Sequence, residues 1–411
     1  MDTPIIVAID VGTIKVCTLV ARIEDNDQMR ILGVGIEPSK GLNKGIVVDL
    51  NGASKAIAKS IEKAERTSGL EIDSALVSLA GSHVEAINSK GVVGVSGRTI
   101  DEDDINRAID SARAVTIPHN REVIHVIHRG FSVDGQDEIR MPIGMHGYRL
   151  EVETHIITAS APSVDNLREA VQNAGAHVDQ FVLNPLASAE VVLTDTEREM
   201  GVVICDIGGG TTDMAIYING DVWHSYVLGV GGNHITSDIA HGLRLPLPQA
   251  EEIKIQHGCA LQSEVNPDEY FLVRPFGGEG PIQVGRADLA LIIEARTQEI
   301  FSLLVQEIKR SGYDGLLPAG MVLTGGGSAL PSIRKLASQV MGIPVKIGQP
   351  ENLLGMVDQL YSPAYSTSVG LLRWAMLMKE LPTTYKTRQP FRIGGEDLLS
   401  NIWNWLRRLL P

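Results

Sequence analysis

A glycine-rich octet in the middle of the chain restricts the possible folds more than any other stretch, and it reads Asp206-Ile207-Gly208-Gly209-Gly210-Thr211-Thr212-Asp213. Apolar runs precede and follow it, so we predict two buried strands with the octet at the tip of a β-hairpin. Three glycines let the backbone adopt positive φ and approach a ligand closely. Their N–H groups, with the Thr211 and Thr212 hydroxyls, form a donor surface that suits phosphate oxygens. Asp206 ends a strand, where a carboxylate could hold a hydrated Mg²⁺. An unliganded turn is an equally good interpretation of the octet alone.

The same arrangement occurs near the N-terminus. A predicted strand ends at Asp10, and a turn with Gly12 and Thr13 leads to a second apolar run. Lys15 adds a cation that could reach a phosphate. One such turn is common hairpin chemistry. Two Asp-headed turns in separate parts of the chain favour a phosphate-binding cleft.

A third glycine loop follows a predicted strand over 321–324 and precedes a helix that begins after Pro331. Such a turn places backbone N–H groups and the positive end of a helix dipole near an anion or a nucleoside. The loop consists of Gly325, Gly326, Gly327 and Ser328. It is not a Walker loop, because the pattern G-x-x-x-x-G-K-[ST] does not occur in the sequence.

Length and composition narrow the classes of function. A chain of 411 residues is too long for one simple core and predicts at least two domains. With 44% apolar and 21% charged residues the chain is expected to be globular. The net charge of −14 argues against nucleic-acid binding, which needs a basic face. We expect a cytosolic protein for three reasons. The chain has only three cysteines, an odd and small number that fits buried thiols in a reducing compartment. It also shows no signal-like leader and no apolar run long enough to span a membrane.

Alternating strand and helix patterns predict an α/β core. Residues 84–158 differ, because strand-like stretches surround a single helix over 101–114, and we predict an inserted interaction subdomain. His125 and His128 lie three apart in a predicted strand and therefore face opposite sides, which argues against a shared metal ion. Ser163 is predicted to cap the helix that follows the insert.

Two apolar helices, near 182–193 and 366–374, are predicted to link the two halves, and small residues such as Ser188 would permit close helix–helix contact. A long helix over 286–310 carries Arg296 in the middle of its apolar stripe. This arginine either snorkels to water or pairs within the protein, or it receives a partner with acidic and apolar side chains. The residues alone favour the internal interpretation.

The end of the chain has a different character. From Lys379 it becomes rich in Pro and Thr, which predicts a tether. After the tether we predict an amphipathic helix over 396–411, with an apolar face formed by Leu398, Leu399, Ile402, Trp403, Trp405, Leu406, Leu409 and Leu410. Residues 379–411 carry six Lys/Arg and three Asp/Glu, although the whole chain is acidic. The tryptophans, basic flanks and tether favour an interfacial membrane anchor over a helix that docks on protein.

Three glycine loops, two of them in Asp-headed hairpins, together with two linking helices resemble the actin-type ATPase superfamily. This resemblance implies an α/β protein of two actin-like domains with ribonuclease H-like halves, and it says little about function because kinases and chaperone ATPases share the fold. The insert, the stretches 237–240 and 251–261 and the tethered helix resemble the FtsA family of bacterial cell-division proteins over nearly the whole chain. The implied division is a first half (1–83, 159–196 and 365–378), an insert (84–158), a second half (197–228 and 312–364) with its own subdomain (229–311), a tether (379–395) and a membrane-targeting helix (396–411).

The FtsA resemblance implies ATP with Mg²⁺ between the halves and head-to-tail protofilaments on the cytoplasmic side of the inner membrane at the division site. It implies that the protein tethers FtsZ, whose acidic and apolar tail binds the second half, and that later division proteins bind 84–158. By the same resemblance, Asp10 and Asp206 hold the metal, and Arg296 and Ser237 contact a partner. The implied nucleotide-binding residues are Gly12, Thr13, Lys15, Gly208, Gly209, Gly210, Thr211, Thr212, Glu251, Lys254, Gly325, Gly326, Gly327 and Ser328.

One position departs from related bacterial actins such as MreB, in which a glutamate at the start of the first linking helix positions the attacking water. Asn184 stands there in this chain and cannot act as a general base. We therefore predict ATP binding with slow or undetectable turnover. Two alternatives remain. A small-molecule kinase of the same fold would need an acidic base at a substrate cleft, and a pilus-assembly protein similar to PilM should lack the terminal anchor.

Overall fold

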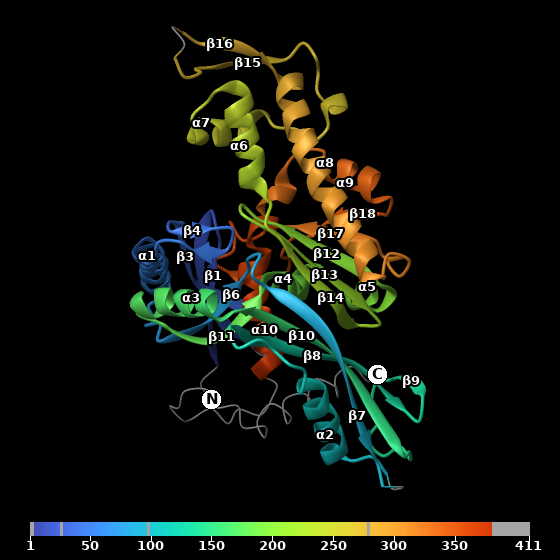
Figure 1. The fold of residues 1–411 in the computed structure, drawn as a ribbon. Coiled ribbons are helices and arrows are strands. Elements are labelled where there is room, and N and C mark those ends of the chain that lie inside the picture. The colour runs from blue at the N-terminus through green and yellow to red at the C-terminus, as the bar shows by residue number, and fades with distance from the viewer. Residues whose placement is uncertain (1–3, 25–27, 97–98, 278–279, 380–411) are drawn as a thin grey trace.

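The computed structural model describes residues 4–24, 28–96, 99–277 and 280–379. A six-stranded sheet forms the first half, and its strands β1, β2 and β3 make an antiparallel meander while β6 and β11 add in parallel. The strand order is β11 (His177–Leu183), β6 (Ser74–Leu79), β1 (Ile5–Val11), β2 (Lys15–Ile23), β3 (Met29–Pro38) and β19 (Leu354–Gly355). Helices α1 (Leu50–Ser68) and α3 (Ala161–Asn173) cover one face of this sheet, as Figure 1 shows.

A five-stranded sheet of the same kind forms the second half. Its antiparallel strands β12, β13 and β14 are followed in space by parallel β17 and β18. The order is β14 (Asp221–Leu228), β13 (Thr212–Ile218), β12 (Val202–Ile207), β17 (Met321–Thr324) and β18 (Val345–Ile347). Helices α8 (Arg286–Ser311) and α9 (Ile333–Met341) pack on its outer face, and the short α5 (Asp195–Met200) precedes β12. The two halves therefore repeat one architecture.

Two helices, α4 (Asn184–Val192) and α10 (Ser366–Lys379), lie between the two sheets. Ala187 and Leu371 join the core on the inner face of the first sheet, whereas Leu186 and Ala189 join the core of the second. Small residues allow the two helices to approach closely, because a Cβ on Gly370 would lie 1.9 Å from the carbonyl oxygen of Ala187. The predicted pair of linking helices is confirmed.

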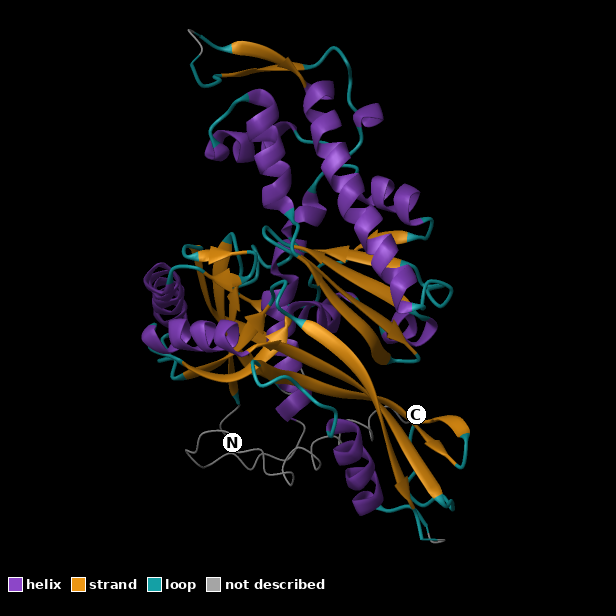
Figure 2. Ribbon diagram, in the orientation of Figure 1, coloured by secondary structure: helices purple, strands orange, loops and turns teal. Residues whose placement is uncertain are grey.

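Residues between β6 and α3 form a separate four-stranded antiparallel sheet that projects from the first half (Figure 2). Its order is β7 (Glu85–Gly94), β10 (Arg149–Ser160), β8 (Arg121–Val133) and β9 (Gln136–Ile139), and helix α2 (Glu102–Arg113) covers one face. The predicted α+β insert is thus present. In the second half, a cap consists of α6 (Gly232–Leu243), α7 (Leu247–His257) and the hairpin of β15 (Tyr270–Val273) and β16 (Ile282–Gly285). A small hairpin, β4 (Leu42–Asn43) and β5 (Ile46–Val47), completes the first half.

Local signals explain several boundaries. Helix α1 begins where the Asp49 side chain accepts a hydrogen bond from the Gly52 N–H, and it ends at Gly69, whose φ of 71° suits a residue without a Cβ. The prediction that Ser163 caps α3 is wrong. The cap position is Ser160, because a proline in the first turn needs no hydrogen-bond acceptor and lets the helix begin earlier.

Candidate functional site

The two Asp-headed hairpins meet at one cavity. The octet connects β12 to β13 and residues 12–14 connect β1 to β2, so both predicted hairpins are confirmed. Asp10 and Asp206 are the next-to-last residues of equivalent strands, and both line a cavity of about 410 Å³ between the halves. A volume of this size is within the usual range for a small-molecule site.

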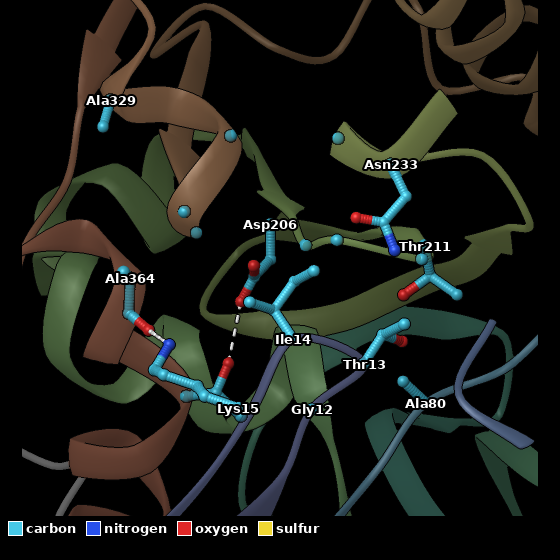
Figure 3. A pocket seen from close by; sticks show the side chains of 18 of the residues that line it. Gly12, Thr13, Ile14, Lys15, Ala80, Asp206, Thr211, Asn233, Ala329 and Ala364 are labelled. Atoms are coloured by element: carbon cyan, nitrogen blue, oxygen red, sulfur yellow. Dashed lines mark hydrogen bonds between the residues drawn. The ribbon is translucent and has the colours of Figure 1, made fainter. Parts of the chain in front are cut away.

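The cavity gathers most of the predicted site residues from distant parts of the chain (Figure 3). Those that line it are Asp10, Gly12, Thr13, Lys15, Asp206, Gly208, Gly209, Gly210, Thr211, Glu251, Lys254, Gly325, Gly326 and Gly327. Glu251 and Lys254 of α7 are therefore part of the cavity wall. Lys254 donates to the carbonyl of Gly232 at 3.1 Å and pairs with Glu251 at 2.7 Å.

Two of the predicted residues do not reach the cavity wall. The Thr212 hydroxyl donates to the carbonyl of Val230 at 2.8 Å, and the residue is fully buried in β13. The Ser328 hydroxyl donates to the carbonyl of Gly325 at 2.7 Å and closes a 3₁₀ turn. Both hydroxyls bond to backbone carbonyls, so the Thr212 hydroxyl does not join the donor surface as expected, and the assignment of Thr212 and Ser328 to nucleotide binding stays a prediction.

Glycines allow the two hairpin loops to touch. A Cβ on Gly209 would lie 2.4 Å from Ile14, and a Cβ on Gly210 would lie 2.6 Å from the Thr13 hydroxyl. Gly325 has a φ of 82°, and a Cβ there would lie 2.2 Å from Oδ1 of Asp206. The glycines thus provide a cradle of backbone that any larger residue would fill.

Lys15 directly follows the loop of residues 12–14, as the first residue of β2. Its Nζ donates to the carbonyl of Ala364 at 2.5 Å, which Figure 3 shows as a dashed line, and it lies 4.5 Å from the ring centre of Tyr365. It therefore joins the β1–β2 hairpin to the residues just before α10, while its side chain still lines the cavity.

Hydroxyl groups of the linking helices hold both aspartates. Ser188 of α4 and Thr367 of α10 donate to the same Oδ2 of Asp206, at 2.6 and 2.8 Å, and Ser368 donates to Oδ2 of Asp10 at 2.6 Å. Burial raises the pKa of the Asp206 carboxyl, whereas the bonds from Ser188 and Thr367 lower this pKa.

Asp213 is a cavity residue that the sequence analysis did not assign to the site. It is 1% exposed, and its Oδ1, like Oδ1 of Asn184, has no hydrogen-bond partner among the described residues. Burial, followed by the nearby Asp206, raises the pKa of Asp213 well above its usual value, although bonds from Thr211 and Asn184 lower it. A buried acceptor without a donor at a cavity wall usually marks a place for water or a ligand. Its position at the end of the octet was the available signal.

These features fit a Mg²⁺–nucleotide. Among the described residues, no three His, Cys, Asp or Glu side chains converge closely enough to hold an ion by themselves. Mg²⁺ commonly binds through one or two carboxylates, waters and substrate phosphates, so the pair Asp10 and Asp206 suits that chemistry. The unpartnered oxygen of Asp213 adds a further acceptor for a metal-bound water.

The other predicted residues lie elsewhere. Arg296 is on α8 and faces the cap, where it makes two bonds to Asp238 of α6, at 2.6 and 3.0 Å, and another to Glu299 of its own helix. This is the internal pairing that the residues alone favoured. Ser237 is half-buried on α6 beside Asp238. His125 and His128 are buried in the insert, where burial lowers the pKa of each to about 4. The predicted tether and amphipathic helix, 380–411, lie outside the described residues.

Solved structures share this architecture. The chain superimposes on a pilus-biogenesis PilM–PilN complex with a TM-score of 0.63 at 16% identity, covering 89% of this chain and 97% of the other. It also superimposes on MreB5 of Spiroplasma citri bound to ADP, with a TM-score of 0.55 at 15% identity, covering 92% and 99%. With the two hairpins and linking helices, these likenesses place the chain in the actin-like class of two-domain proteins.

Sequence comparisons define the family within this class. A model of the cell division protein FtsA matches residues 203–370, and a model of the SHS2 domain inserted in FtsA matches 81–158. The chain is 40% identical to the cell division protein FtsA of Pseudomonas aeruginosa over 371 residues, covering 90% of this chain and 89% of that one. It is 38% identical to FtsA of Neisseria meningitidis over 400 residues, covering 97% of both. The chain belongs to the FtsA family of cell division proteins.

Proposed function

We propose that this protein binds ATP with Mg²⁺ in the cleft between its halves. The observation that carries the proposal is that two Asp-headed hairpins line one cavity in a chain of the FtsA family. Asp10 and Asp206 would hold the metal, and Lys15 would neutralise phosphate charge. The glycine loops would supply backbone donors. Solved structures of MreB5 of Spiroplasma citri contain ADP or AMPPNP, which supports a nucleotide at this cleft.

Binding of a fluorescent ATP analogue, titrated with and without Mg²⁺, tests this proposal. The parent should bind in a Mg²⁺-dependent way, and Asp206→Asn should weaken binding at least about tenfold because it removes a metal-facing charge. Asp314→Asn is the matched control, since Asp314 is exposed in a loop away from the cavity. Parent protein that shows no Mg²⁺-dependent binding would refute the proposal.

Hydrolysis is expected to be slow. Asn184 and Asp213 each present one oxygen acceptor without a partner, and two acceptors can hold one water by its two hydrogens. Of the two, only Asp213 can take a proton, so we assign it as the base for any residual turnover. Asp213→Asn should abolish phosphate release while ATP still binds. Phosphate release equal to that of the parent would contradict this assignment.

We further propose that the protein polymerises on the cytoplasmic face of the inner membrane. It would attach to this membrane through the segment that follows α10. The composition of residues 396–411 supports a helix that inserts its apolar face among lipids. Among the described residues there is no helix with the length and apolarity to span a bilayer. Flotation with vesicles of phosphatidylethanolamine and phosphatidylglycerol should recover the intact chain but not a chain ending at Lys379. Substitution of Trp403 and Trp405 by Ala should reduce recovery, whereas Asn404→Ala should not.

On such vesicles the protein would tether FtsZ during division, through the cap of the second half. Arg296 is already paired with Asp238, so an acidic FtsZ tail would have to share or displace that carboxylate. Arg296→Ala should weaken binding of an FtsZ tail peptide, and Asp238→Asn should strengthen it because it removes one of the two carboxylates that pair with the guanidinium and leaves only Glu299. Arg310→Ala, at the far end of the same helix, is the control. Binding unaffected by both Arg296→Ala and Asp238→Asn would remove Arg296 from the contact.

A further inference from the structure

The first turn of α10 contains three consecutive hydroxyl residues, and each one bonds to a different loop of the cleft. Ser366 bonds to Thr324 at 2.6 Å, where β17 enters the third glycine loop. Thr367 donates to Asp206 and Ser368 donates to Asp10. A single turn of helix therefore contacts all three loops that surround the cavity.

The bonds to Asp206 are buried and come from both linking helices. Ser188 is 0% exposed, Thr367 is 7% exposed, and both donate to the same carboxylate oxygen. The other oxygen, Oδ1, lies against Gly325, which lines the cavity. The two hydroxyls thus fix the plane of the carboxylate and leave Oδ1 on the ligand side.

The hydroxyls of Ser188 and Thr367 also contact each other. Each hydroxyl has one hydrogen, so when both hydrogens go to Asp206 none remains for the 2.9 Å contact between Ser188 and Thr367. If Asp206 turns toward a ligand and releases one hydroxyl, that hydroxyl can donate to its neighbour. A buried hydroxyl without an acceptor is costly, and this arrangement avoids that cost.

We propose that Ser188 and Thr367 are positioning residues for the metal-side carboxylate of the cleft, and that their mutual contact keeps α4 and α10 joined when Asp206 turns toward a Mg²⁺–nucleotide. The inference rests on the proposed nucleotide function and deepens it, because it assigns how the metal end of the site is oriented. Thr367 also lines the cavity, whereas Ser188 is not among its lining residues. Each acts through Asp206.

The test compares Thr367→Val, Thr367→Ser and Ser366→Ala in the full chain. Valine keeps the shape of threonine but lacks the hydroxyl, whereas serine keeps the hydroxyl. Ser366→Ala removes a neighbouring hydroxyl that bonds to Thr324 and to neither aspartate. The measured quantity is the Mg²⁺ concentration that gives half-maximal tight binding of a fluorescent ATP analogue. A parallel titration in EDTA measures metal-independent binding.

Thr367→Val should raise the required Mg²⁺ concentration at least about tenfold, since the Asp206 carboxylate loses one of the two donors that orient it. Thr367→Ser and Ser366→Ala should change it by less than about twofold, and binding in EDTA should be equal for all variants. Ser188→Ala should reproduce the valine result if Thr367→Val does not fold. An unchanged Mg²⁺ requirement in both hydroxyl-loss variants, or an equal loss in EDTA, would overturn the inference. If the parent itself shows no Mg²⁺-dependent binding, the proposed function fails and the inference with it.

Discussion

The crossing of the two linking helices gives a prediction with a calculable geometry. Gly370 of α10 faces Ala187 of α4, and an added Cβ would lie 1.9 Å from the Ala187 carbonyl oxygen and 2.4 Å from its carbon. Real Cβ atoms essentially never approach within 3.0 Å, so Gly370→Ala requires the helices to separate by about 1 Å. Both contacting atoms belong to backbone at the centre of the protein, so no rotamer change can relieve the clash.

Two effects of opposite sign decide the magnitude. Alanine favours a helix over glycine by about 1 kcal/mol. Overpacking a closely packed interior costs about 1–3 kcal/mol and occasionally more. The clash here is with backbone, so we expect the upper end of that range. The displacement also strains the bonds from Thr367 and Ser188 to Asp206, one turn away. We expect a net loss of about 2 kcal/mol in the free energy of unfolding.

Urea unfolding followed by circular dichroism measures this loss, with Gly94→Ala as the matched control. Gly94 ends strand β7, and a Cβ there would meet no atom within 4 Å. The control should therefore change stability by less than about 0.5 kcal/mol. If Gly370→Ala stabilises the protein by about 1 kcal/mol, as helix propensity alone predicts, the clash does not exist and the described crossing of α4 and α10 is wrong.

Two further predictions concern the contact between the insert and the second half. The side chain of Arg129 in the insert is only 7% exposed, lies 5.0 Å from the centre of the Trp223 ring and donates to the Trp223 carbonyl. Arg129→Ala should therefore lower the free energy of unfolding in urea by about 2 kcal/mol. Arg149→Ala, which loses an ion pair within the insert, should lower it by less than about 1 kcal/mol. Equal effects would remove Arg129 from that contact. Burial lowers the pKa of His155 to about 3, so the unfolded chain binds a proton that the folded one does not and stability falls as pH drops below about 6.5. His155→Gln should reduce that slope by about 1.4 kcal/mol per pH unit between roughly pH 6 and 4, measured by urea unfolding across pH, and an unchanged slope would contradict a neutral buried imidazole.

The sequence predicted the features of the fold that local chemistry determines. Apolar runs on both sides of a glycine turn are enough to predict a hairpin, and both hairpins formed as expected. Gly69 ends α1 through equally local chemistry, because its positive φ suits a residue without a Cβ. The meeting of the hairpins at one cavity required a resemblance to known proteins, because spacing alone does not specify how two halves face each other.

The errors and omissions at the site have a common physical cause. The direction of a side chain depends on strand register and on partners distant in sequence. Thr212 begins β13 and bonds to Val230, so its hydroxyl faces away from the cavity although Thr211 faces into it. Ser188 and Thr367 come into contact with Asp206 only when the chain has folded, so no local sequence pattern predicts that they bond to this carboxylate. For Arg296, the charge pattern showed the need for a partner but not that Asp238 supplies it.

The contacts of the insert bear on how the cleft can open. The insert is connected to the first half between β6 and α3, but it also contacts the second half. His155 of the insert bonds to Ser225 of β14, and Arg129 donates to the Tyr313 hydroxyl. A rotation of the halves about α4 and α10 must therefore break these bonds or move the insert with it. Apolar packing accompanies these bonds, because Ile157 of the insert shares a buried cluster with Val222 and Val227 of β14, so separating the insert from the second half would also expose apolar surface. A partner that binds the insert more tightly in one arrangement of the halves would then change the affinity of the cleft for nucleotide. A nucleotide in the cleft would change the affinity of the insert for that partner by the same free energy, because coupling between two sites is reciprocal.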